Sequence, residues 1–423
     1  MIARVLLITS HYPPSNLTAV HRVRLFANHL PHCGWEPVVL TVDEQYYEEK
    51  PDPELLELIP FGQRIEKVSA LPVTKPRMIG DVGLRGFFQL VQRASKLIKR
   101  ERIDFVYIFI PSFYLALIGK VLFMRFGVRY GIDYIDPWVH YFPGSERKFS
   151  RHWFSSLVAK ILEPWAVSAA SLITGVSESY YNPVLKRNPH LISATKTYAM
   201  PYGWDRTEQA VLLKLNKCGY LYGNDAKIRL VYAGAYLPKS KELLVAFFNV
   251  IASNPLLFSD VCIHFIGTGK NYKDGIESSI AQLAHQYGIS SQLIFEHPLR
   301  LSYFDVLAHV RDASGVFILG STEPHYSPSK LFNAILMKIP VFALLHKDCP
   351  VNDVIRSSDW GVVCEYDEQL SQESICSEIE RKFEAWKLKT INKEWSFIQE
   401  KVESLSVEQL ISPLGDIMHA INK

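Results

Sequence analysis

The feature that most constrains the fold is an alternation of short apolar runs with helical patterns. A β-branched and Leu-rich run at residues 4–9 precedes a helical pattern over residues 19–30, and a second apolar run follows at residues 37–42. Strand, helix and strand within about forty residues form a βαβ unit. Such a unit requires a parallel sheet with helices on both faces.

The same alternation continues along the chain in two series. The first series adds strands at 105–110, 131–135 and 172–176, with helices at 113–126 and 153–169. The second places strands at 228–234, 261–266, 293–296 and 315–319, with helices at 241–251, 275–287, 303–310 and 329–337. We therefore predict an α/β protein with two Rossmann-like, doubly wound parallel sheets.

Residues 206–227 separate the two series, because they show no clean period and are rich in Gly, Asn and Asp toward their end. We predict a first domain at 1–205, a linker at 206–227 and a second domain at 228–399. The last stretch is largely helical, and we expect residues 400–423 to pack back on the first domain. Ligands of open α/β sheets bind at the carboxyl ends of the strands, so we expect a cleft between the two domains.

Composition narrows the class of protein further. With 48% hydrophobic and 21% charged residues among 423, the chain is neither disordered nor fibrous, and a net charge of +3 argues against a dedicated nucleic-acid binder. The six cysteines form no CxxC pair and no zinc pattern. No apolar run has the length of a secretory or membrane-spanning segment, so we expect a reduced, cytoplasmic protein.

A glycine turn follows one strand of the second domain. Gly267, Thr268 and Gly269 let the backbone approach a ligand closely and would aim amides into the cleft. The third glycine of a dinucleotide fingerprint is replaced by Tyr272, which disfavours NAD or FAD. No DxD motif for a divalent metal is present, so we predict no metal and no separate cofactor.

A lysine marks the start of the helix at 329–337. Ser329 is suited to the helix start, and Lys330 adds a full positive charge to the positive end of the helix dipole. This combination suits a diphosphate. Lys239 and Lys241, after the turn at Gly234, would lie on the same rim. The alternative is an ordinary capped helix with solvated lysines.

The first domain offers candidates for acceptor chemistry. Asp136 stands at a strand end and His140 follows it closely, so a carboxylate and an imidazole could position or deprotonate a hydroxyl group. His11 lies in the first loop, and Arg22 lies in the first helical pattern. The alternative for Asp136 is a turn-forming residue before Pro137.

Ten short segments, taken in order, resemble the GT-B glycosyltransferases of glycosyltransferase family 4, of the kind used in bacterial capsule, exopolysaccharide or O-antigen assembly. These segments are residues 10–14, 21–22, 34–41, 133–138, 170–178, 202–205, 232–234, 265–269, 328–333 and 339–341. The resemblance rests on their number and order.

The resemblance implies a GT-B fold and a metal-independent, retaining transfer of a sugar from a nucleoside-diphosphate donor, above all a UDP- or GDP-sugar. The acceptor would be a hydroxyl group of a lipid-linked or polysaccharide intermediate. The implied donor residues are Gly234, Lys239, Lys241, Gly267, Thr268, Gly269, Ser329, Lys330 and Asn333. The implied acceptor residues are His11, Tyr12, Asn16, Arg22 and Asp136, with Asp136, His140 and Glu323 as catalytic candidates.

Departures from the family pattern open an alternative function, and one of them is the loss of the glycine pair usual in the first loop, where Asn16 and Leu17 stand. Asn333 stands where the family has a glutamate that holds the nucleotide ribose, and Glu323 lies ten residues before it rather than eight. An amide lacks the charge of a carboxylate, so donor affinity would fall. A catalytically weak, sugar-nucleotide-binding or scaffold subunit is the alternative.

Charge is distributed unevenly along the chain. Residues 75–160 hold 15 basic and six acidic side chains, interleaved with aromatic residues such as Phe88, Trp153 and Phe154. This pattern is typical of a face that contacts an anionic membrane, and we expect peripheral contact with the inner face of a membrane. A solvated basic rim is the alternative.

Overall fold

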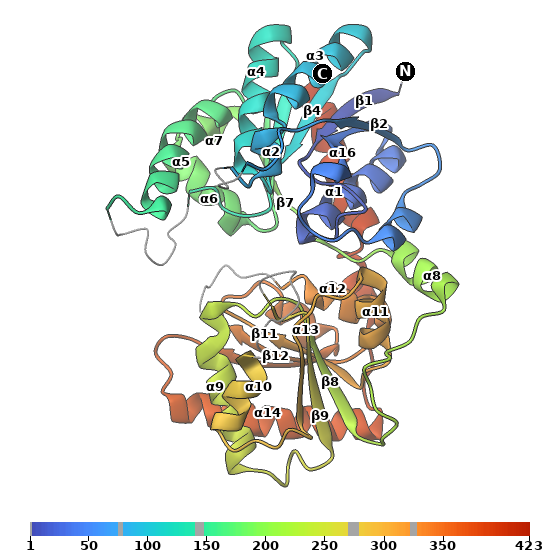
Figure 1. The fold of residues 1–423 in the computed structure, drawn as a ribbon, viewed down its shortest axis with the longest axis vertical. Helices are drawn as coiled ribbons and strands as arrows, with labels where there is room; N and C mark the ends of the chain where they lie inside the picture. Colours follow the sequence, from blue (N-terminus) through green and yellow to red (C-terminus); the bar gives the residue numbers. More distant parts are fainter. Residues whose placement is uncertain (1, 75–78, 140–147, 270–278, 322–327) are drawn as a thin grey trace. The chain divides into compact units, whose positions relative to one another are not determined.

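The computed structural model describes residues 2–74, 79–139, 148–269, 279–321 and 328–423. The chain divides into two compact units (Figure 1). Unit 1 comprises Met1–Tyr202 and Val407–Lys423, and unit 2 comprises Gly203–Ser406. Each unit contains one parallel sheet with helices on both faces, so the predicted fold class is confirmed.

Unit 1 contains a seven-stranded sheet in the order β3-β2-β1-β4-β5-β6-β7. Its strands are β1 (Ala3–Ile8), β2 (Trp35–Val42), β3 (Arg64–Val68), β4 (Phe105–Phe109), β5 (Tyr130–Tyr134), β6 (Leu172–Gly175) and β7 (Lys196–Ala199). Its α-helices are α1 (Thr18–His29), α2 (Val82–Arg85), α3 (Phe87–Arg100), α4 (Ala116–Phe126), α5 (Arg151–Val167), α6 (Glu178–Arg187), α7 (Leu191–Ala194) and α16 (Val407–Asn422). Short 3-10 helices are η1 (Leu30–Cys33), η2 (Glu44–Tyr46), η3 (Pro53–Leu58) and η4 (Phe113–Leu115).

The central strands of unit 1, such as β1, β4 and β5, are buried on both faces, as their apolar runs require. In β1, Leu6 and Ile8 point toward the core beneath α3, α4 and α5. Val5 and Leu7 point to the opposite core, which α1 and α16 cover. Successive side chains of a strand alternate between the two faces, so one apolar run supplies both cores.

Helix α16 returns the end of the chain to unit 1. It packs against α1 and η1, and it buries six apolar side chains. Trp35, at the start of β2, donates its indole N–H to the Gly415 carbonyl at 3.5 Å, and its ring stacks on His419 with 4.8 Å between ring centroids. The end of the chain is therefore an integral part of unit 1.

Unit 2 contains a six-stranded sheet in the order β10-β9-β8-β11-β12-β13. Its strands are β8 (Ile228–Ala233), β9 (Val261–Ile266), β10 (Ile294–His297), β11 (Gly315–Leu319), β12 (Val341–His346) and β13 (Gly361–Tyr366). Its helices are α8 (Arg206–Leu215), η5 (Pro238–Ser240), α9 (Lys241–Ser253), α10 (Ser279–Gln286), α11 (Tyr303–Arg311), α12 (Lys330–Met337), α13 (Asn352–Ser357), α14 (Gln372–Asn392) and α15 (Gln399–Glu403).

Aromatic side chains dominate the core under α9 and α14. Phe247 of α9 lies 4.9 Å, centroid to centroid, from Phe317 of β11. Phe383 of α14 stacks on Phe258 at 4.4 Å and contacts Phe342 of β12 edge-on at 5.1 Å. These buried rings hold the two helices on one face of the sheet.

The structure contains elements that the sequence prediction lacks, among them helices α3 and α13, and it places a helix in the predicted linker. Helix α8 occupies the first half of the segment predicted as an irregular linker, where Asp205 caps the helix by accepting a hydrogen bond from the Thr207 amide at 2.9 Å. Strands β3, β7, β12 and β13 were not predicted. Strands β3 and β7 are the edge strands of their sheet and carry polar side chains, which hides their pattern.

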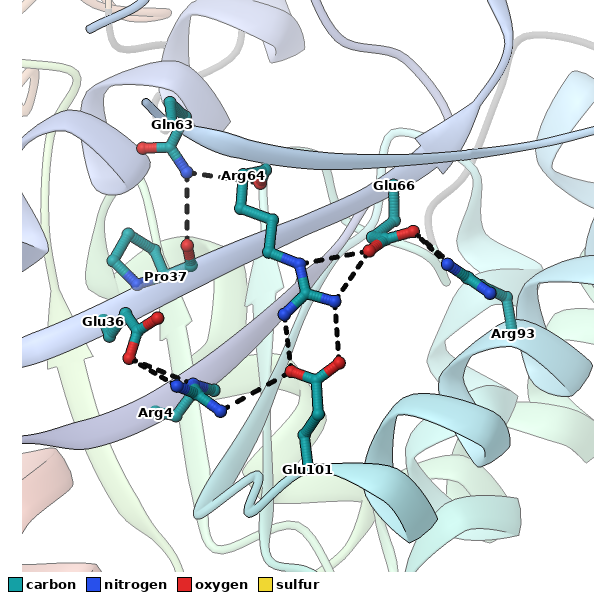
Figure 2. A network of polar contacts seen from close by, with 8 residues as sticks. All are labelled: Arg4, Glu36, Pro37, Gln63, Arg64, Glu66, Arg93 and Glu101. Atoms are coloured by element: carbon teal, nitrogen blue, oxygen red, sulfur yellow. Dashed lines mark hydrogen bonds and ion pairs between the residues drawn. The ribbon is translucent and has the colours of Figure 1, made fainter. Parts of the chain in front are cut away.

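A chain of ion pairs joins β1, β2, β3 and α3 (Figure 2). Arg64 bonds both carboxylate oxygens of Glu101, at 2.5 and 2.7 Å, and also bonds Glu66 at 2.8 Å. Arg93 extends the chain from Glu66, and Arg4 extends it from Glu101. Because Arg4 and Arg64 start their parallel strands, this network lies at the amino ends, away from the edge where ligands bind such sheets.

Candidate functional site

Strand order reverses once in each sheet, and a ligand site is expected at the point of reversal. In unit 2 the reversal occurs at β8, which has β9 on one side and β11 on the other. Gly234, Gly267 and Gly320 directly follow β8, β9 and β11. Crevices at the carboxyl ends of such strands bind ligands in open α/β sheets.

Lys330 reaches this edge from the start of α12. Its ammonium group lies 4.2 Å from the centroid of the Tyr232 ring, at the end of β8. A Cβ atom at Gly234 would lie 2.9 Å from Cε and 3.3 Å from Nζ of Lys330. Gly234 also has φ +130°, which L side chains rarely adopt. The backbone conformation therefore favours glycine there, and any side chain would also have to displace the end of Lys330.

No carboxylate of the described residues neutralises the charge of Lys330. Among the residues that the structure describes, no acidic side chain forms an ion pair with it, and the side chain is half-buried. A partly desolvated ammonium group resting on an aromatic face is well placed to bind an anion.

The glycine turn supplies space rather than hydrogen-bond donors. The amides of Gly234, Gly267 and Gly269 donate to the carbonyls of Ile266, His297 and Pro298, at 2.8, 2.7 and 3.0 Å. The expectation that the Gly267 and Gly269 amides point at a ligand is therefore wrong. Gly267 has φ +73°, and a Cβ there would lie 4.0 Å from the Gly234 amide nitrogen, so the two turns adjoin.

Glu296 organises the same loop from β10. It accepts a hydrogen bond from the Thr268 hydroxyl at 2.6 Å, and its other oxygen accepts the Ile280 and Ala281 amides at 2.9 Å each. The positive end of α10 is thus occupied by the protein's own carboxylate. Sequence analysis missed this role of Glu296, because its partners are 15 to 28 residues away in the chain.

Helix α12 brings two more predicted residues to the edge. Ser329 stands at its N-cap position with a helical backbone, and its side chain makes no capping hydrogen bond. Asn333 lies one turn after Lys330, on the same side of the helix. The Asn333 amide is half-buried and forms no hydrogen bond to another part of the described chain.

Two further lysines, Lys239 and Lys241, flank Ser240, which is hydrogen-bonded to the end of β11. The Ser240 hydroxyl is buried and donates to the Gly320 carbonyl at 2.5 Å. Lys239 precedes Ser240 and is half-buried, whereas Lys241 follows it and is exposed. Ser240 thereby anchors the backbone of both lysines beside the carboxyl end of β11.

In unit 1, His11 lies in the loop that follows β1. Its Nδ1 lies 2.9 Å from the Ser10 hydroxyl, and its Nε2 lies 3.8 Å from Glu49. The Tyr47 ring packs on the imidazole with 4.6 Å between centroids. Burial lowers the pKa of His11 below its ordinary value, although the charges of Glu49 and Asp81 oppose this. A neutral imidazole can act as a base.

The rest of this loop faces inward. Tyr12 is buried, and its amide donates to the Tyr47 hydroxyl at 3.0 Å. The side-chain amide of Asn16 donates to Asp52 at 3.0 Å. Burial raises the pKa of Tyr12 far above its usual range, so its phenol stays neutral. Tyr12 therefore supports the loop from within and does not line the surface as predicted.

Arg22 is placed differently from its prediction as an acceptor-side loop residue. It lies in α1 with 1% of its surface exposed and binds both oxygens of Asp133 in β5, at 2.5 and 2.8 Å. It also donates to the carbonyl of Met200 at 2.7 Å. Asp133 accepts a hydrogen bond from Thr174 at 2.5 Å. Arg22 thus joins α1 to β5 and to the segment that follows β7, and Asp133 extends the network to β6.

Asp136 lies at the predicted edge of unit 1, directly after β5, and is exposed. Two residues on, Trp138 is buried and stacks on Phe113 with 6.1 Å between centroids, which holds this segment in place. The other two catalytic candidates, His140 and Glu323, lie outside the described residues.

Two absences among the described residues concern metal ions and membranes. They contain no cluster of three or more His, Cys, Asp or Glu side chains placed to hold a metal ion. Within the same residues, no helix combines the length and apolar character needed to cross a membrane.

Comparison with known proteins identifies the fold. No family model matches the sequence, and no curated protein matches it. Among solved structures, sucrose-phosphate synthase from Thermosynechococcus elongatus superposes with a TM-score of 0.65 at 13% identity, covering 99% of both chains.

Two further structures give the same result. HepE from Anabaena, solved in complex with UDP-glucose, has a TM-score of 0.63 at 13% identity and covers 99% of both chains. A UDP-forming trehalose-phosphate synthase from Burkholderia xenovorans has a TM-score of 0.64 at 9% identity over the full length of both chains. The chain therefore has the GT-B fold of these glycosyltransferases.

Proposed function

We propose that the protein is a glycosyltransferase that moves a sugar from a nucleoside-diphosphate donor to an acceptor hydroxyl group. The observation that carries this proposal is the position of Lys330. It is a lysine without a carboxylate partner in the described chain, at a helix start, beside the Gly234 turn where strand order reverses. A UDP- or GDP-sugar is the donor that we expect.

The chemistry of the donor explains why this position is suitable. Sugar transfer breaks the bond between the anomeric carbon and a diphosphate oxygen, and negative charge develops on the departing diphosphate. The ammonium group of Lys330 and the positive end of α12 would stabilise that charge. Lys239 and Lys241 would add to the positive potential, and Asn333 would hydrogen-bond the nucleotide.

The contacts of α10 argue against its N-terminus as the diphosphate site and so support the start of α12. Glu296 occupies the N-terminus of α10, so a phosphate there would meet a carboxylate. The start of α12 has no such anion among the described residues and carries Lys330 instead. HepE, which shares the fold, was crystallised with UDP-glucose, and this favours UDP as the donor nucleotide.

The acceptor would bind to unit 1. There Asp136 is exposed at the end of β5, and His11 is held neutral at the end of β1. A carboxylate can orient the attacking hydroxyl, and an imidazole can take up its proton. We propose a lipid-linked or polysaccharide glycan as acceptor and a retaining, metal-independent reaction.

Asn333 favours one alternative, a subunit that binds sugar nucleotides with little or no turnover. Where a carboxylate would form charge-assisted hydrogen bonds to ribose hydroxyls, an amide forms weaker ones. Binding of a sugar nucleotide without turnover would identify this alternative.

A thermal-shift screen with UDP, GDP, dTDP and CMP tests the donor assignment. One nucleoside diphosphate should raise the melting temperature in a concentration-dependent manner, because a ligand that binds only the folded state stabilises it by mass action. Incubation with the matching sugar nucleotide and a glycan acceptor should then release the free nucleoside diphosphate. If no nucleotide shifts the melting temperature, the proposal is wrong.

A further inference from the structure

The outer face of α5 is apolar although it is exposed. Phe154, Leu157, Ile161 and Trp165 are spaced by three, four and four residues, so they form one stripe along the helix. Each is between 40% and 64% exposed. The stripe is about 16 Å long at the rise of an α-helix. We call it the α5 stripe.

This stripe is unusual for a helix on the surface of a sheet protein. The opposite side of α5 already packs on the core of unit 1 through Ala159, Ala166 and Val167. The exposed side of such a helix is ordinarily polar. Helix α4 packs beside α5 and adds Met124, which is 65% exposed. Contiguous exposed apolar side chains indicate an interaction surface.

The charges on these two helices are all of one sign at the surface. Helices α4 and α5 carry four basic residues in their sequence, of which Arg125 and Lys160 are exposed. Their one acidic residue, Glu163, is buried and bonds Arg187 at 2.5 and 2.6 Å. Exposed acidic side chains are therefore absent from both helices throughout their described surface.

We propose that the α5 stripe and the neighbouring bases of α4 and α5 dock unit 1 on an anionic lipid surface. Large apolar side chains flanked by Lys and Arg are the composition with which helices lie in the plane of a membrane interface. Phe154, Ile161 and Trp165 would enter the headgroup layer. Arg125 and Lys160 would bind lipid phosphates.

Charge complementarity distinguishes this occupant from a second copy of the chain. Two such faces brought together would place bases opposite bases, with no exposed acid on either helix to pair with them. An anionic bilayer neutralises them instead. The proposal does not depend on the proposed enzymatic function, because vesicle binding is measured without donor or acceptor.

Co-sedimentation of the full chain with lipid vesicles tests the proposal. The protein should bind vesicles of mixed phosphatidylglycerol and phosphatidylcholine and should bind pure phosphatidylcholine at least tenfold more weakly. Raising the salt from about 0.05 M to about 0.5 M should weaken binding, since the attraction is partly electrostatic. Absence of binding to anionic vesicles would overturn the proposal.

Substitutions in α4 and α5 test whether the α5 stripe and its neighbouring bases are the surface that binds the vesicles. Ile161→Ser/Trp165→Ser should lower binding at least tenfold, and Arg125→Gln/Lys160→Gln should lower it about fivefold per charge at low salt. Leu256→Ser is the matched control, because Leu256 is also strongly exposed but belongs to unit 2. Unchanged binding in the first variant, at an unchanged melting temperature, would overturn the proposal. So would a dimer in lipid-free solution that the first variant dissociates.

Discussion

At the scale of single residues, Arg22 and Asp133 form the most consequential pair in unit 1. Both are at most 1% exposed, and the guanidinium group binds the carboxylate through two hydrogen bonds. Arg22 donates a further hydrogen bond to the Met200 carbonyl, and the Thr174 hydroxyl donates one to Asp133. Arg22, which the family resemblance suggested for the acceptor side, thus has a structural role as the partner of Asp133.

Arg22→Met is predicted to destabilise unit 1 by about 3–5 kcal/mol, because it leaves the Asp133 charge buried without its partner. Arg22→Met/Asp133→Leu should recover part of that loss, since no uncompensated charge remains. Urea unfolding followed by tryptophan fluorescence measures both free energies. A loss below about 1 kcal/mol for the single variant would show that the pair contributes little.

The side chain at position 333 is predicted to influence the affinity for the donor nucleotide. Asn333→Glu is predicted to tighten binding of the nucleoside diphosphate up to about tenfold, because charge-assisted hydrogen bonds to ribose hydroxyls are stronger than neutral ones. Asn333→Gln is the control with similar length and no charge. Isothermal titration calorimetry measures the affinities, and loss of binding in Asn333→Glu would show that this turn of α12 does not face the nucleotide.

At the scale of elements, three histidines, of which His264 and His309 are buried and His297 is half-buried, lie beneath the segment that precedes β8. His264 of β9 stacks on His297 of β10, with 5.8 Å between ring centroids. His309 of α11 accepts the Leu221 amide at 3.1 Å through Nε2, so this nitrogen carries no proton. Tyr222 packs edge-on against both His264 and His309.

The histidine cluster predicts acid sensitivity of unit 2. Burial, helped by nearby positive charges, lowers the pKa of His264 to about 4, whereas its unperturbed value is 6.5. The unfolded chain therefore binds a proton that the folded chain excludes between these values. Its contribution to stability is complete above pH 6.5 and is lost as the pH falls toward 4, by up to about 3 kcal/mol.

His264→Phe should flatten this pH dependence, because phenylalanine can pack against Phe295 without titrating. Unfolding free energies measured at several pH values between 4 and 7 give the two slopes. Equal slopes in the wild type and the variant would contradict the assignment of the acid sensitivity to His264.

The elements that sequence alone predicted are those with a clear internal pattern. The central strands β1, β4, β8 and β9 are continuous apolar runs, and the helices beside them show helical spacing. Edge strands such as β3 and β7 gave no such signal, because their pairing depends on a distant partner strand.

In the candidate site, too, the features set by local sequence could be predicted, and those that depend on distant segments could not. Gly234, Lys330 and Asn333 could be predicted, because a turn or a helix start fixes the position of each. The contact between Lys330 and Tyr232, and the capping of α10 by Glu296, could not be predicted. Both join segments that only the sheet order brings together.

At the scale of the whole molecule, the chain leaves unit 1 after Tyr202, builds unit 2 and returns at Val407. Unit 1 is therefore completed only when the last seventeen or so residues are in place. Truncation after Ser406 would expose the Trp35 face of the sheet and remove six buried apolar side chains.

That truncation is predicted to unfold unit 1, because burial of each apolar side chain contributes about 1.5–3 kcal/mol and a domain is stable by only about 5–15 kcal/mol. Limited proteolysis measures this, with a chain lacking only Lys423 as control. Equal resistance of residues 1–202 to protease in both chains would contradict an integral role for α16.

The proposed function requires the diphosphate of a sugar nucleotide to bind at Lys330, beside the Gly234 turn. Calorimetric titration of UDP and GDP into the wild type and two variants tests it most directly. Lys330→Gln should weaken nucleotide binding about 10- to 100-fold, through loss of a charge-assisted contact. Lys338→Gln, an exposed change at the other end of α12, should leave the affinity unchanged. Equal affinities in the wild type and Lys330→Gln, or no binding of either nucleotide to the wild type, would contradict the claim.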